Sequence, residues 1–285
     1  MKLFAKKSAL EKNFERARKE GWALGQFNFS TLEQLRGIMK AGEEFSTPVI
    51  CGTSEGEAGF FGIKEAAHAL KVGREKCNAE FFLNFDHGKS FETVKEAVDT
   101  GYDMVHFDGS HLSLEENIKE TRRVVSYARK RGVLVEGEVS KIEGKSASLK
   151  GEARKTTLTS LEKVAKFIER TGVDCIALDV GNVHGVYPEM PRLYLERIDE
   201  LLKRVSCFVV LHGGSGVDEV KIREAVSRGV VKVNINTELR VSWKEALKKS
   251  LAEKGDEVAP YKLLPPAGKA VQEKVEEKIK LLSNV

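Results

Sequence analysis

The stretch that decides the fold runs from residue 208 to residue 233 and reads FVVLHGGSGVDEVKIREAVSRGVVKV. Its two ends, Phe208–Leu211 and Val230–Val233, are short apolar runs with the length of a buried strand. Between them, Asp218–Ser227 places apolar residues at helical spacing. A strand, a helix and a second strand in this order predict a βαβ unit, in which the two strands are parallel.

The same alternation occupies the rest of the chain. Six more apolar runs have the length of strands, and they are Ala23–Gln26, Pro48–Cys51, Glu80–Phe85, Met104–Phe107, Val133–Glu136 and Cys175–Leu178. Amphipathic segments follow the strands at Leu32–Phe45, Lys64–Leu70, Phe91–Asp99, Leu114–Lys130, Leu161–Arg170, Leu193–Val205 and Glu238–Leu251. Eight parallel strands joined by right-handed crossovers predict an α/β fold, the (β/α)8 TIM barrel, and an open doubly wound sheet is the alternative.

Both ends of the chain carry one more amphipathic segment. We expect additional N- and C-terminal helices at Leu10–Arg18 and at Lys269–Leu282. No repeat or flexible linker divides the sequence, and a barrel of this kind needs about 250 residues. The 285 residues therefore predict a single domain over residues 1–285.

Composition excludes several classes of protein. Hydrophobic residues make up 41% and charged residues 32%, a mixture that disordered and fibrous chains lack. The 47 basic and 43 acidic residues leave a net charge of +4, which argues against nucleic acid or a membrane surface as a partner and favours a small molecule. The four cysteines form no CxxC pair, so free thiols are expected. Residues 1–7 lack the apolar core of a signal peptide, and no apolar run has the roughly 20 residues of a membrane-spanning helix, so we expect a soluble cytoplasmic protein.

Polar residues gather where the predicted strands end. In a TIM barrel the catalytic groups stand at the C-terminal ends of the strands. Chemically capable residues follow six of the strands, in the segments Asp86-His87-Gly88, Asp108–His111, Glu136-Gly137-Glu138, Asp179–Gly185, His212–Gly216 and Asn234–Thr237. These side chains are therefore expected to meet at one rim of the barrel.

Three histidines at this rim suit a metal. His87, His184 and His212 each follow a strand and adjoin a glycine. Three imidazoles with an open fourth position are a ligand set of catalytic zinc. One such histidine alone is more often a hydrogen-bonded structural residue, but their common placement favours a zinc site.

Two carboxylates are placed to assist these histidines. Glu138 and Asp108 are expected to be further metal ligands or to orient the imidazoles through hydrogen bonds. Ordinary salt bridges are the alternative. Among the remaining histidines, His106 and His111 are weaker candidates, and His68 is expected to be an ordinary helix residue.

A glycine-rich turn indicates an anion site. Gly213-Gly214-Ser215-Gly216 precedes a predicted helix, so its amides can surround a phosphate at the helix N-terminus. A tight turn without a ligand is the alternative, but Asn234 and Thr237 follow the next strand, where barrels often bind phosphate. The irregular stretch Val139–Leu158 predicts a mobile active-site loop, with an idle surface insertion as the alternative. A metal beside a phosphate site favours a phosphorylated substrate, and both hydrolysis and carbon–carbon bond chemistry fit.

Several motifs agree with one family in order along nearly the whole chain. They are Phe27-Asn28-Phe29, Ser54-Glu55-Gly56, Asp86-His87-Gly88, Asp108-Gly109-Ser110, Glu136-Gly137-Glu138, Gly181–Gly185, His212–Gly216 and Lys232-Val233-Asn234. In these motifs the chain resembles the class II (metal-dependent) ketose-bisphosphate aldolases, and it is most similar to the fructose-bisphosphate aldolases. The resemblance implies the TIM barrel and a carbon–carbon lyase of carbohydrate metabolism.

The resemblance also implies roles for the rim residues. The implied zinc ligands are His87, His184 and His212, with Glu138 and Asp108 near an alternative metal position. The aldehyde oxygen of the substrate would be served by Asp86 as the acid. Binding of the substrate and its phosphate is implied for Gly185, Gly213, Ser215, Asn234, Asn236 and Thr237. A monovalent cation, Na⁺ or K⁺, near the phosphate and a homodimer or homotetramer are implied as well.

Four positions depart from the family pattern. They are Ser146 in place of a glutamate base eight residues after Glu138, Pro188 in place of a lysine near the phosphate, Asn236 in place of an aspartate, and Gly268 in place of an arginine. A serine hydroxyl accepts a proton poorly at neutral pH, so Glu143 or Glu152 is the expected loop base.

The expected activity is the reversible cleavage of a ketose 1,6-bisphosphate to glycerone phosphate and glyceraldehyde 3-phosphate, as in glycolysis. Fructose 1,6-bisphosphate is the first choice of substrate, and tagatose 1,6-bisphosphate or another phosphorylated ketose is the second. A sugar-phosphate-binding homologue that keeps zinc without turnover and a metal-assisted hydrolase are the remaining alternatives.

Overall fold

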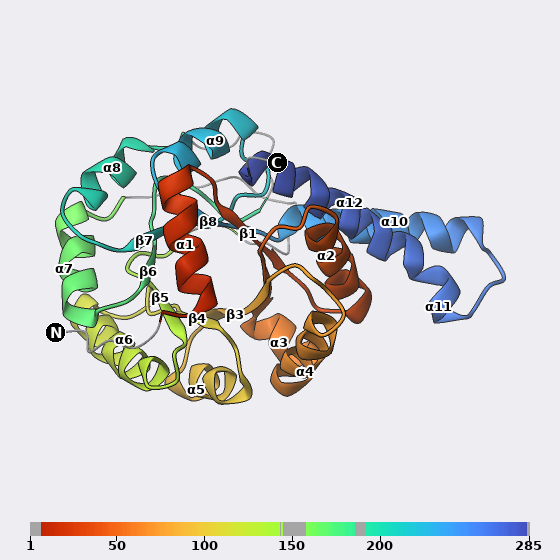
Figure 1. Cartoon of the computed structure of the whole chain (residues 1–285), viewed down its shortest axis with the longest axis horizontal. Helices are drawn as coiled ribbons and strands as arrows, with labels where there is room; N and C mark the ends of the chain where they lie inside the picture. Colours follow the sequence, from red (N-terminus) through yellow and green to blue (C-terminus); the bar gives the residue numbers. More distant parts are fainter. Residues whose placement is uncertain (1–6, 143, 145–157, 186–191, 284–285) are drawn as a thin grey trace.

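Eight parallel strands close into a barrel (Figure 1). The computed structural model describes residues 7–142, 144, 158–185 and 192–283. The strands are β1 (Leu24–Asn28), β2 (Val49–Ser54), β3 (Phe81–Gly88), β4 (Met104–Phe107), β5 (Leu134–Glu138), β6 (Cys175–Ala177), β7 (Phe208–Leu211) and β8 (Val230–Ile235). Each strand pairs with the next one in sequence, and β8 pairs with β1. The predicted TIM barrel is confirmed, and the open sheet is excluded.

Helices surround the barrel in the predicted order. They are α1 (Ala9–Glu20), α2 (Leu32–Glu44), α3 (Glu55–Phe61), α4 (Ile63–Arg74), α5 (Phe91–Thr100), α6 (Leu114–Arg129), α7 (Leu161–Thr171), α8 (Glu196–Leu202), α9 (Glu219–Ser227), α10 (Thr237–Glu253), α11 (Pro260–Leu263) and α12 (Pro265–Leu282). The sequence does not predict α3 and α11, which are too short to show helical periodicity. Helix α3 starts instead from a capping box, in which Ser54 and Glu57 satisfy each other's main-chain N–H groups.

Several strands continue past their predicted ends. Strand β1 ends at Asn28 rather than Gln26, and β5 ends at Glu138 rather than Glu136. A prediction from apolar runs stops at the first polar residues, but here those residues stay in the sheet and face the barrel interior. The added strand length is what carries polar side chains to the rim.

The amino-terminal end of the barrel is closed by apolar packing. Helix α1 lies across this end (Figure 1). Its buried face, Leu10, Phe14 and Ala17, belongs to one apolar cluster with inward-facing residues near the strand starts, which include Leu24, Ile50, Phe82, Met104 and Leu134. Burial of this area excludes water from one end of the barrel and leaves only the opposite end for a ligand.

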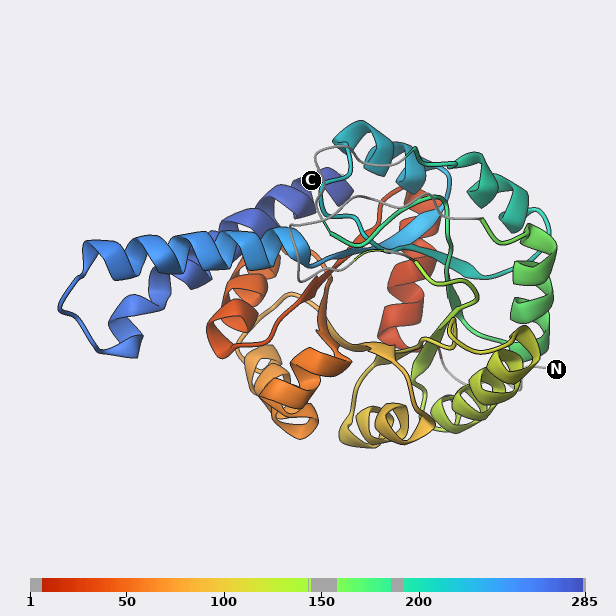
Figure 2. The same cartoon turned by 180° about the vertical axis from the view of Figure 1, so that it is seen from behind.

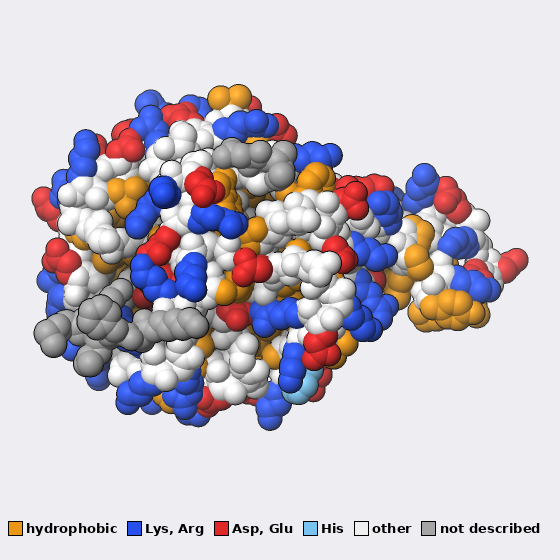
Figure 3. Space-filling view, viewed as in Figure 1, with side chains coloured by type: hydrophobic (Ala, Val, Ile, Leu, Met, Phe, Trp, Pro, Cys, Tyr) orange, Lys and Arg blue, Asp and Glu red, His pale blue; other side chains and the backbone are white. Residues whose placement is uncertain are grey.

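Helices α10 and α12 form an arm that extends beyond the barrel (Figure 2). Hydrophobic side chains gather at the end of this arm (Figure 3). They include Val258 and Tyr261, which are 85% and 76% exposed. Among the described residues, no helix combines the length and the apolar character needed to cross a membrane.

Candidate active site

The candidate active site is a cavity of about 390 Å³ at the carboxyl-terminal rim of the barrel. Its lining includes eleven residues predicted from the sequence, namely Asp86, His87, Asp108, Glu138, His184, Gly185, Gly213, Ser215, Asn234, Asn236 and Thr237. His212 is fully buried against His87. The predicted loop bases Glu143 and Glu152 lie outside the described residues, as do Ser146 and Pro188. The rim therefore brings together the predicted site residues that the structure describes.

An irregularity in β3 turns two consecutive side chains toward the site. The pairing of β3 with β4 shifts register between Phe85 and Gly88. Within the shift His87 has a φ of 54°, in the left-handed region that residues with side chains rarely adopt. Regular alternation would send Asp86 and His87 to opposite faces of the strand. The bulge re-aims one side chain, so that both line the cavity.

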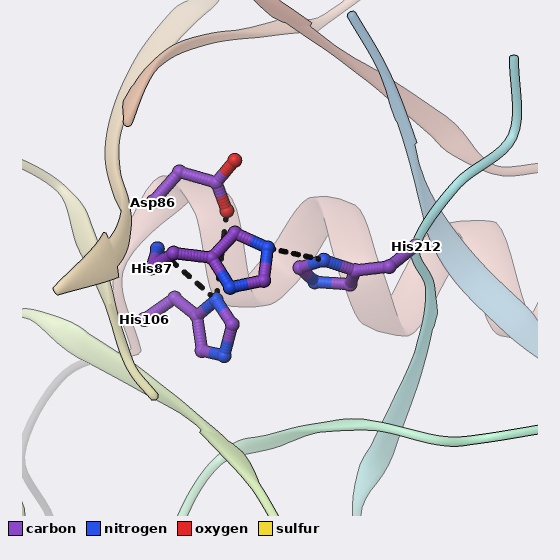
Figure 4. A group of neighbouring side chains, drawn as sticks. All are labelled: Asp86, His87, His106 and His212. Atoms are coloured by element: carbon purple, nitrogen blue, oxygen red, sulfur yellow. Dashed lines mark hydrogen bonds and ion pairs between the residues drawn. The ribbon is translucent and has the colours of Figure 1, made fainter. Parts of the chain in front are cut away.

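His87 and His212 direct bare ring nitrogens at each other. His87 Nδ1 lies 3.0 Å from Asp108 Oδ2, and His212 Nε2 lies 2.5 Å from Glu136 Oε1. Because an ionised carboxylate only accepts hydrogen bonds, these two nitrogens carry the protons when the rings are in the neutral, metal-binding form. The opposite nitrogens, His87 Nε2 and His212 Nδ1, then have lone pairs and lie 3.1 Å apart (Figure 4). Two facing lone pairs at this separation suit a shared cation.

The ring centroids of the three predicted histidines lie close to the separations expected around one zinc ion. Tetrahedral zinc with Zn–N bonds of about 2.0–2.1 Å separates its nitrogen ligands by about 3.3 Å and the ring centroids by about 5 Å. The ring centroid of His87 lies 4.9 Å from that of His212 and 5.0 Å from that of His184. The centroids of His184 and His212 are 5.7 Å apart. Among the described residues, the ligand atoms of Asp86, His87, His106 and His212 lie within 4.8 Å of one another, so this group fits a divalent metal. His184 is close to it by its ring centroid but is not a member of the group.

Two carboxylates approach His87 from the side of its Nδ1 atom. Asp108 accepts the hydrogen bond from that atom and also accepts one from Ser110 Oγ at 2.6 Å. Glu138 Oε2 lies 3.7 Å from the same nitrogen. This oxygen is buried, and no described residue makes a hydrogen bond to it. The geometry suits Asp108 as the residue that orients His87. It leaves Glu138 Oε2 without a hydrogen bond and therefore available as a metal ligand.

His106 is more central than its sequence position suggests. It is fully buried, its Nδ1 accepts a hydrogen bond from the His87 main-chain N–H at 3.3 Å, and its Nε2 lies 3.5 Å from Glu138 Oε2. Strand alternation is the signal that finds it, because alternate residues of β4 face the interior. By contrast, His111 is exposed, and His68 lies in α4 as expected.

A buried ion pair supports His212 from inside the barrel. Lys232 Nζ lies 2.7 Å from Glu136 Oε2, and both side chains are fully buried. Burial alone would raise the pKa of Glu136, but the charge of Lys232 holds it well below its usual range. Strands β5 and β8 meet only across the barrel interior, so the sequence does not reveal this pair.

Burial and neighbouring carboxylates set the protonation of the rim. Burial lowers the pKa of His212 to about 4 and that of His184 well below its ordinary value. Burial would also lower the pKa values of His87 and His106, but both are raised, because Asp86 beside the first and Glu136 beside the second outweigh burial. Burial raises the pKa of Glu138 to about 8, with the nearby charge of Asp108 acting in the same direction. Neutral imidazoles are the form that binds a metal.

Asp86 is held between two side-chain amides. Asn28 Nδ2 donates to its Oδ2 at 3.0 Å, and Asn234 Nδ2 donates to its Oδ1 at 3.3 Å. Burial would raise the pKa of Asp86, but the neighbouring His87 and His106 lower it well below its usual range. The result is an ionised carboxylate on the cavity wall beside the histidines.

The residues of the expected anion site lie near the starts of two helices, α9 and α10. The Asp218 carboxylate accepts hydrogen bonds from the first turn of α9, so that end of α9 already holds a negative charge. Helix α10 begins at Thr237, which lines the cavity. The glycine-rich turn approaches the same wall, and at Gly213, where φ is 64°, a Cβ atom would come within 2.1 Å of Val183 O. The first turn of α10 carries Glu238, which accepts a hydrogen bond from the Gly216 main-chain N–H at 2.6 Å, so a carboxylate lies at the start of both helices.

Known proteins of similar sequence and structure are named as aldolases. The family model described as fructose-bisphosphate aldolase class-II matches residues 8–285. The "Probable fructose-bisphosphate aldolase" of Bacillus subtilis is 37% identical over 262 residues, which are 91% of each chain. The fructose-bisphosphate aldolase of Geobacillus stearothermophilus is 35% identical over 88% of each chain. The crystal structure of the YdjI aldolase from Escherichia coli K12 is similar with a TM-score of 0.80 and 30% identity, over 97% of both chains.

Proposed function

The chain belongs to the class II fructose-bisphosphate aldolase family, a family of metal-dependent lyases that act on phosphorylated sugars, and we propose that it uses zinc to cleave a ketose 1,6-bisphosphate reversibly. Fructose 1,6-bisphosphate is the proposed substrate because it gives the names of the relatives from Bacillus and Geobacillus. The proposed products are glycerone phosphate and glyceraldehyde 3-phosphate. We place the reaction in glycolysis and the protein in the cytoplasm.

One observation carries the proposal. His87 Nε2 and His212 Nδ1 lie 3.1 Å apart, and the other nitrogen of each ring is held by a carboxylate. Nitrogen donors fixed in this way are the usual ligands of catalytic zinc. We propose His87, His184 and His212 as the zinc ligands, with Asp108 orienting His87 and Glu138 at an alternative metal position. When bound, the ion supplies positive charge that stabilises developing negative charge on substrate oxygens.

Asp86 is the proposed catalytic acid. It lies on the cavity wall, ionised and held by Asn28 and Asn234, close to the proposed ligands. In the cleavage direction the aldehyde-side hydroxyl loses its proton as the carbon–carbon bond breaks, and in the synthesis direction the aldehyde oxygen gains one. Asp86 accepts that proton in cleavage and donates it in synthesis.

The phosphate of the glycerone half is proposed to bind at the N-terminus of α10. Gly185, Gly213, Ser215 and Thr237 line that part of the cavity. Main-chain N–H groups and the helix dipole favour a doubly charged phosphate there. A monovalent cation, Na⁺ or K⁺, is proposed beside it.

Glu143 or Glu152 is the proposed loop base. In the synthesis direction it removes a proton from the carbon of glycerone phosphate that forms the new bond, and in the cleavage direction it returns that proton. Gly144, which lies between these two glutamates in the sequence, forms a parallel bridge with His184 at the rim. Position 146 is a serine, which cannot take this role efficiently.

A homodimer or homotetramer is the proposed assembly, with the whole chain acting as one domain. Its support is the apolar end of the arm, where Val258 and Tyr261 are exposed. Exposed apolar groups that gather in one place commonly mark an interface. Light scattering of the purified protein measures the assembly directly.

A panel of ketose bisphosphates tests the activity. We expect release of glycerone phosphate from fructose 1,6-bisphosphate, its loss on chelation and its return with zinc. Preference for tagatose 1,6-bisphosphate would change the proposed substrate. Release of inorganic phosphate would indicate a hydrolase, and binding without turnover of any substrate would indicate a sugar-phosphate-binding homologue.

A further inference from the structure

Glu57 is a buried carboxylate that does not line the cavity itself but contacts two residues that do, Asn28 and Asn236. It lies in α3 and is 6% exposed. Its Oε2 accepts hydrogen bonds from Asn28 Nδ2 at 3.0 Å and from the Ser54 main-chain N–H at 2.8 Å. Its Oε1 accepts hydrogen bonds from Asn236 Nδ2 at 3.1 Å and from Arg240 Nη2 at 2.5 Å. The roles proposed above for the site residues do not account for Glu57 or for its four hydrogen bonds.

The carboxylate fixes which way the Asn236 amide points. A carboxylate beside Arg240 accepts hydrogen bonds and cannot donate them, so the group that faces it must be the amide nitrogen of Asn236. The amide oxygen, Oδ1, is thereby turned away from Glu57. It is buried on a residue that lines the cavity, and it accepts no hydrogen bond from the described part of the chain. The side chain also makes no capping bond to α10.

An amide oxygen and a phosphate are both acceptors. A carbonyl oxygen has no proton to donate, whereas phosphate at neutral pH presents mainly acceptor oxygens. A sugar hydroxyl can donate a hydrogen bond, and a buried acceptor without a partner gains most from one. The orientation of Asn236 therefore selects for a hydroxyl group of the ligand.

We infer that Glu57 is a positioning residue, which holds Asn236 so that its Oδ1 receives a hydrogen bond from a hydroxyl of the sugar chain. The inference rests on the proposed function, because it takes a phosphorylated sugar as the ligand of the cavity. It gives Asn236, which the sequence indicates only as a residue that binds the substrate or its phosphate, a defined role in recognising a hydroxyl. Arg240 neutralises the carboxylate and keeps it in place.

The effect of removing Glu57 should have opposite signs in the unmodified protein and in the Asn236→Asp variant, and this difference provides a test. In the Glu57→Ala variant the Asn236 amide is free to rotate, and recognition of the hydroxyl weakens. In the Asn236→Asp variant two carboxylates face each other, which is unfavourable in a buried site. In the double variant the introduced carboxylate presents an acceptor oxygen without that repulsion, and Arg240 remains as its counter-ion. Loss of Glu57 is therefore harmful in the unmodified protein and beneficial in the Asn236→Asp background.

Calorimetry on the zinc-loaded protein measures this effect without turnover. The ligands are a hexitol 1,6-bisphosphate, which has no carbonyl group and cannot be cleaved, and its monodeoxy analogues. We expect the unmodified protein to prefer the full polyol over one monodeoxy analogue by at least about tenfold. Glu57→Ala should reduce this preference to about twofold or less, and the double variant should regain most of it.

A matched control separates this role from helix capping. Glu116 completes the same kind of capping box at the start of α6, where it is exposed and remote from the cavity. Glu116→Ala should leave the preference unchanged, although it removes a cap in the same way. If Glu57→Ala does not fold, Glu57→Gln replaces it. A glutamine amide can donate a hydrogen bond to the carboxylate that Asn236→Asp introduces, so Glu57→Gln should also rescue that variant.

The inference is wrong if the double variant binds the polyol more weakly than Asn236→Asp alone, or if every deoxy analogue binds as well as the polyol. It is also wrong if the substitutions change only the response to Na⁺ or K⁺, because Oδ1 would then serve a cation. Failure of the proposed function has a different signature. In that case no ketose bisphosphate is cleaved, whatever the calorimetry shows.

Discussion

The two ends of the barrel interior use the same strands with opposite chemistry. Along β3 the inward side chains are Phe82, Asn84 and Asp86, and along β5 they are Leu134, Glu136 and Glu138. The first residue of each series packs against α1, and the last lines the cavity. Each strand therefore passes from an apolar position at the closed end of the barrel to a polar position at the rim within two inward-facing positions, which are four residues.

A buried polar layer separates the two ends. Asn84 Nδ2 donates to Gln26 Oε1 at 2.7 Å, and Lys232 pairs with Glu136 at 2.7 Å. All four side chains are fully buried. Buried polar groups need partners, so this layer fixes side-chain positions rather than adding apolar stability. The comparison teaches that the closed end stabilises the fold, while the middle layer positions the groups of the open end. Substitutions at the two ends should therefore affect different measurements.

The largest effect is expected at the open end for His212→Ala. The substitution removes a proposed zinc ligand and the hydrogen bond between His212 and Glu136. We expect most bound zinc to be lost and kcat/KM to fall by at least about 10³-fold, measured by elemental analysis and by the cleavage assay. His111→Ala, at an exposed histidine that also follows a strand, is the matched control and should keep both. Full zinc content with normal turnover in His212→Ala would refute the assignment.

Asp86→Ala should separate rate from metal binding at the same end. Loss of the proton-transfer group is expected to reduce kcat by about 10²- to 10⁴-fold, while the zinc content stays at that of the unmodified enzyme. Asp218→Ala removes a carboxylate that only caps α9, and it should retain kcat. A metal-free Asp86→Ala protein would show that Asp86 is a ligand and not the acid.

Phe14→Ala tests the closed end. Phe14 is fully buried between α1 and the barrel floor. The cavity left by its ring should lower the free energy of unfolding by about 3–5 kcal/mol, measured by denaturant titration, with zinc content and kcat of the folded enzyme unchanged. Phe60→Ala is the control, because Phe60 is 78% exposed and its loss should cost less than about 0.5 kcal/mol. A large fall in kcat for Phe14→Ala would contradict the division between the two ends.

The last comparison concerns the pH dependence of the metal-free protein. Burial raises the pKa of Glu138 to about 8 from its ordinary value of 4.5. The folded state thus holds this proton more tightly than the unfolded state, so the stabilisation is fully present below pH 4.5 and is lost as the pH rises towards 8. Over that window Glu138 should lower the free energy of unfolding by up to about 1.4 kcal/mol per pH unit.

Glu138→Gln cannot ionise and should therefore flatten this pH dependence. Denaturant titrations of both metal-free proteins between pH 5 and pH 8 measure the difference. Glu116→Gln, at an exposed glutamate, should keep the slope of the unmodified protein. Equal slopes for Glu138→Gln and the unmodified protein would mean that Glu138 ionises normally in the folded state.

Sequence reasoning reaches the fold because each strand is an apolar run and each helix is amphipathic. It misses α3, since seven residues with Gly56 and Gly59 show no helical period. It finds the rim residues because they follow the strands directly. His106 is underrated because it lies within a strand, where only the inward alternation marks it.

Pairings across the barrel are beyond sequence reasoning. Lys232 and Glu136 are 96 residues apart, and Asn236 and Glu57 are 179 residues apart. Their contacts depend on closure of the sheet, which brings β8 beside β1 and across from β5.

Anomalous diffraction from crystals of active, zinc-loaded enzyme tests the central claim most directly. The account predicts a single strong peak at the zinc edge, within bonding distance of His87 Nε2, His212 Nδ1 and a ring nitrogen of His184. A peak elsewhere on the molecule, or no peak in crystals of enzyme that still cleaves its substrate, would contradict it.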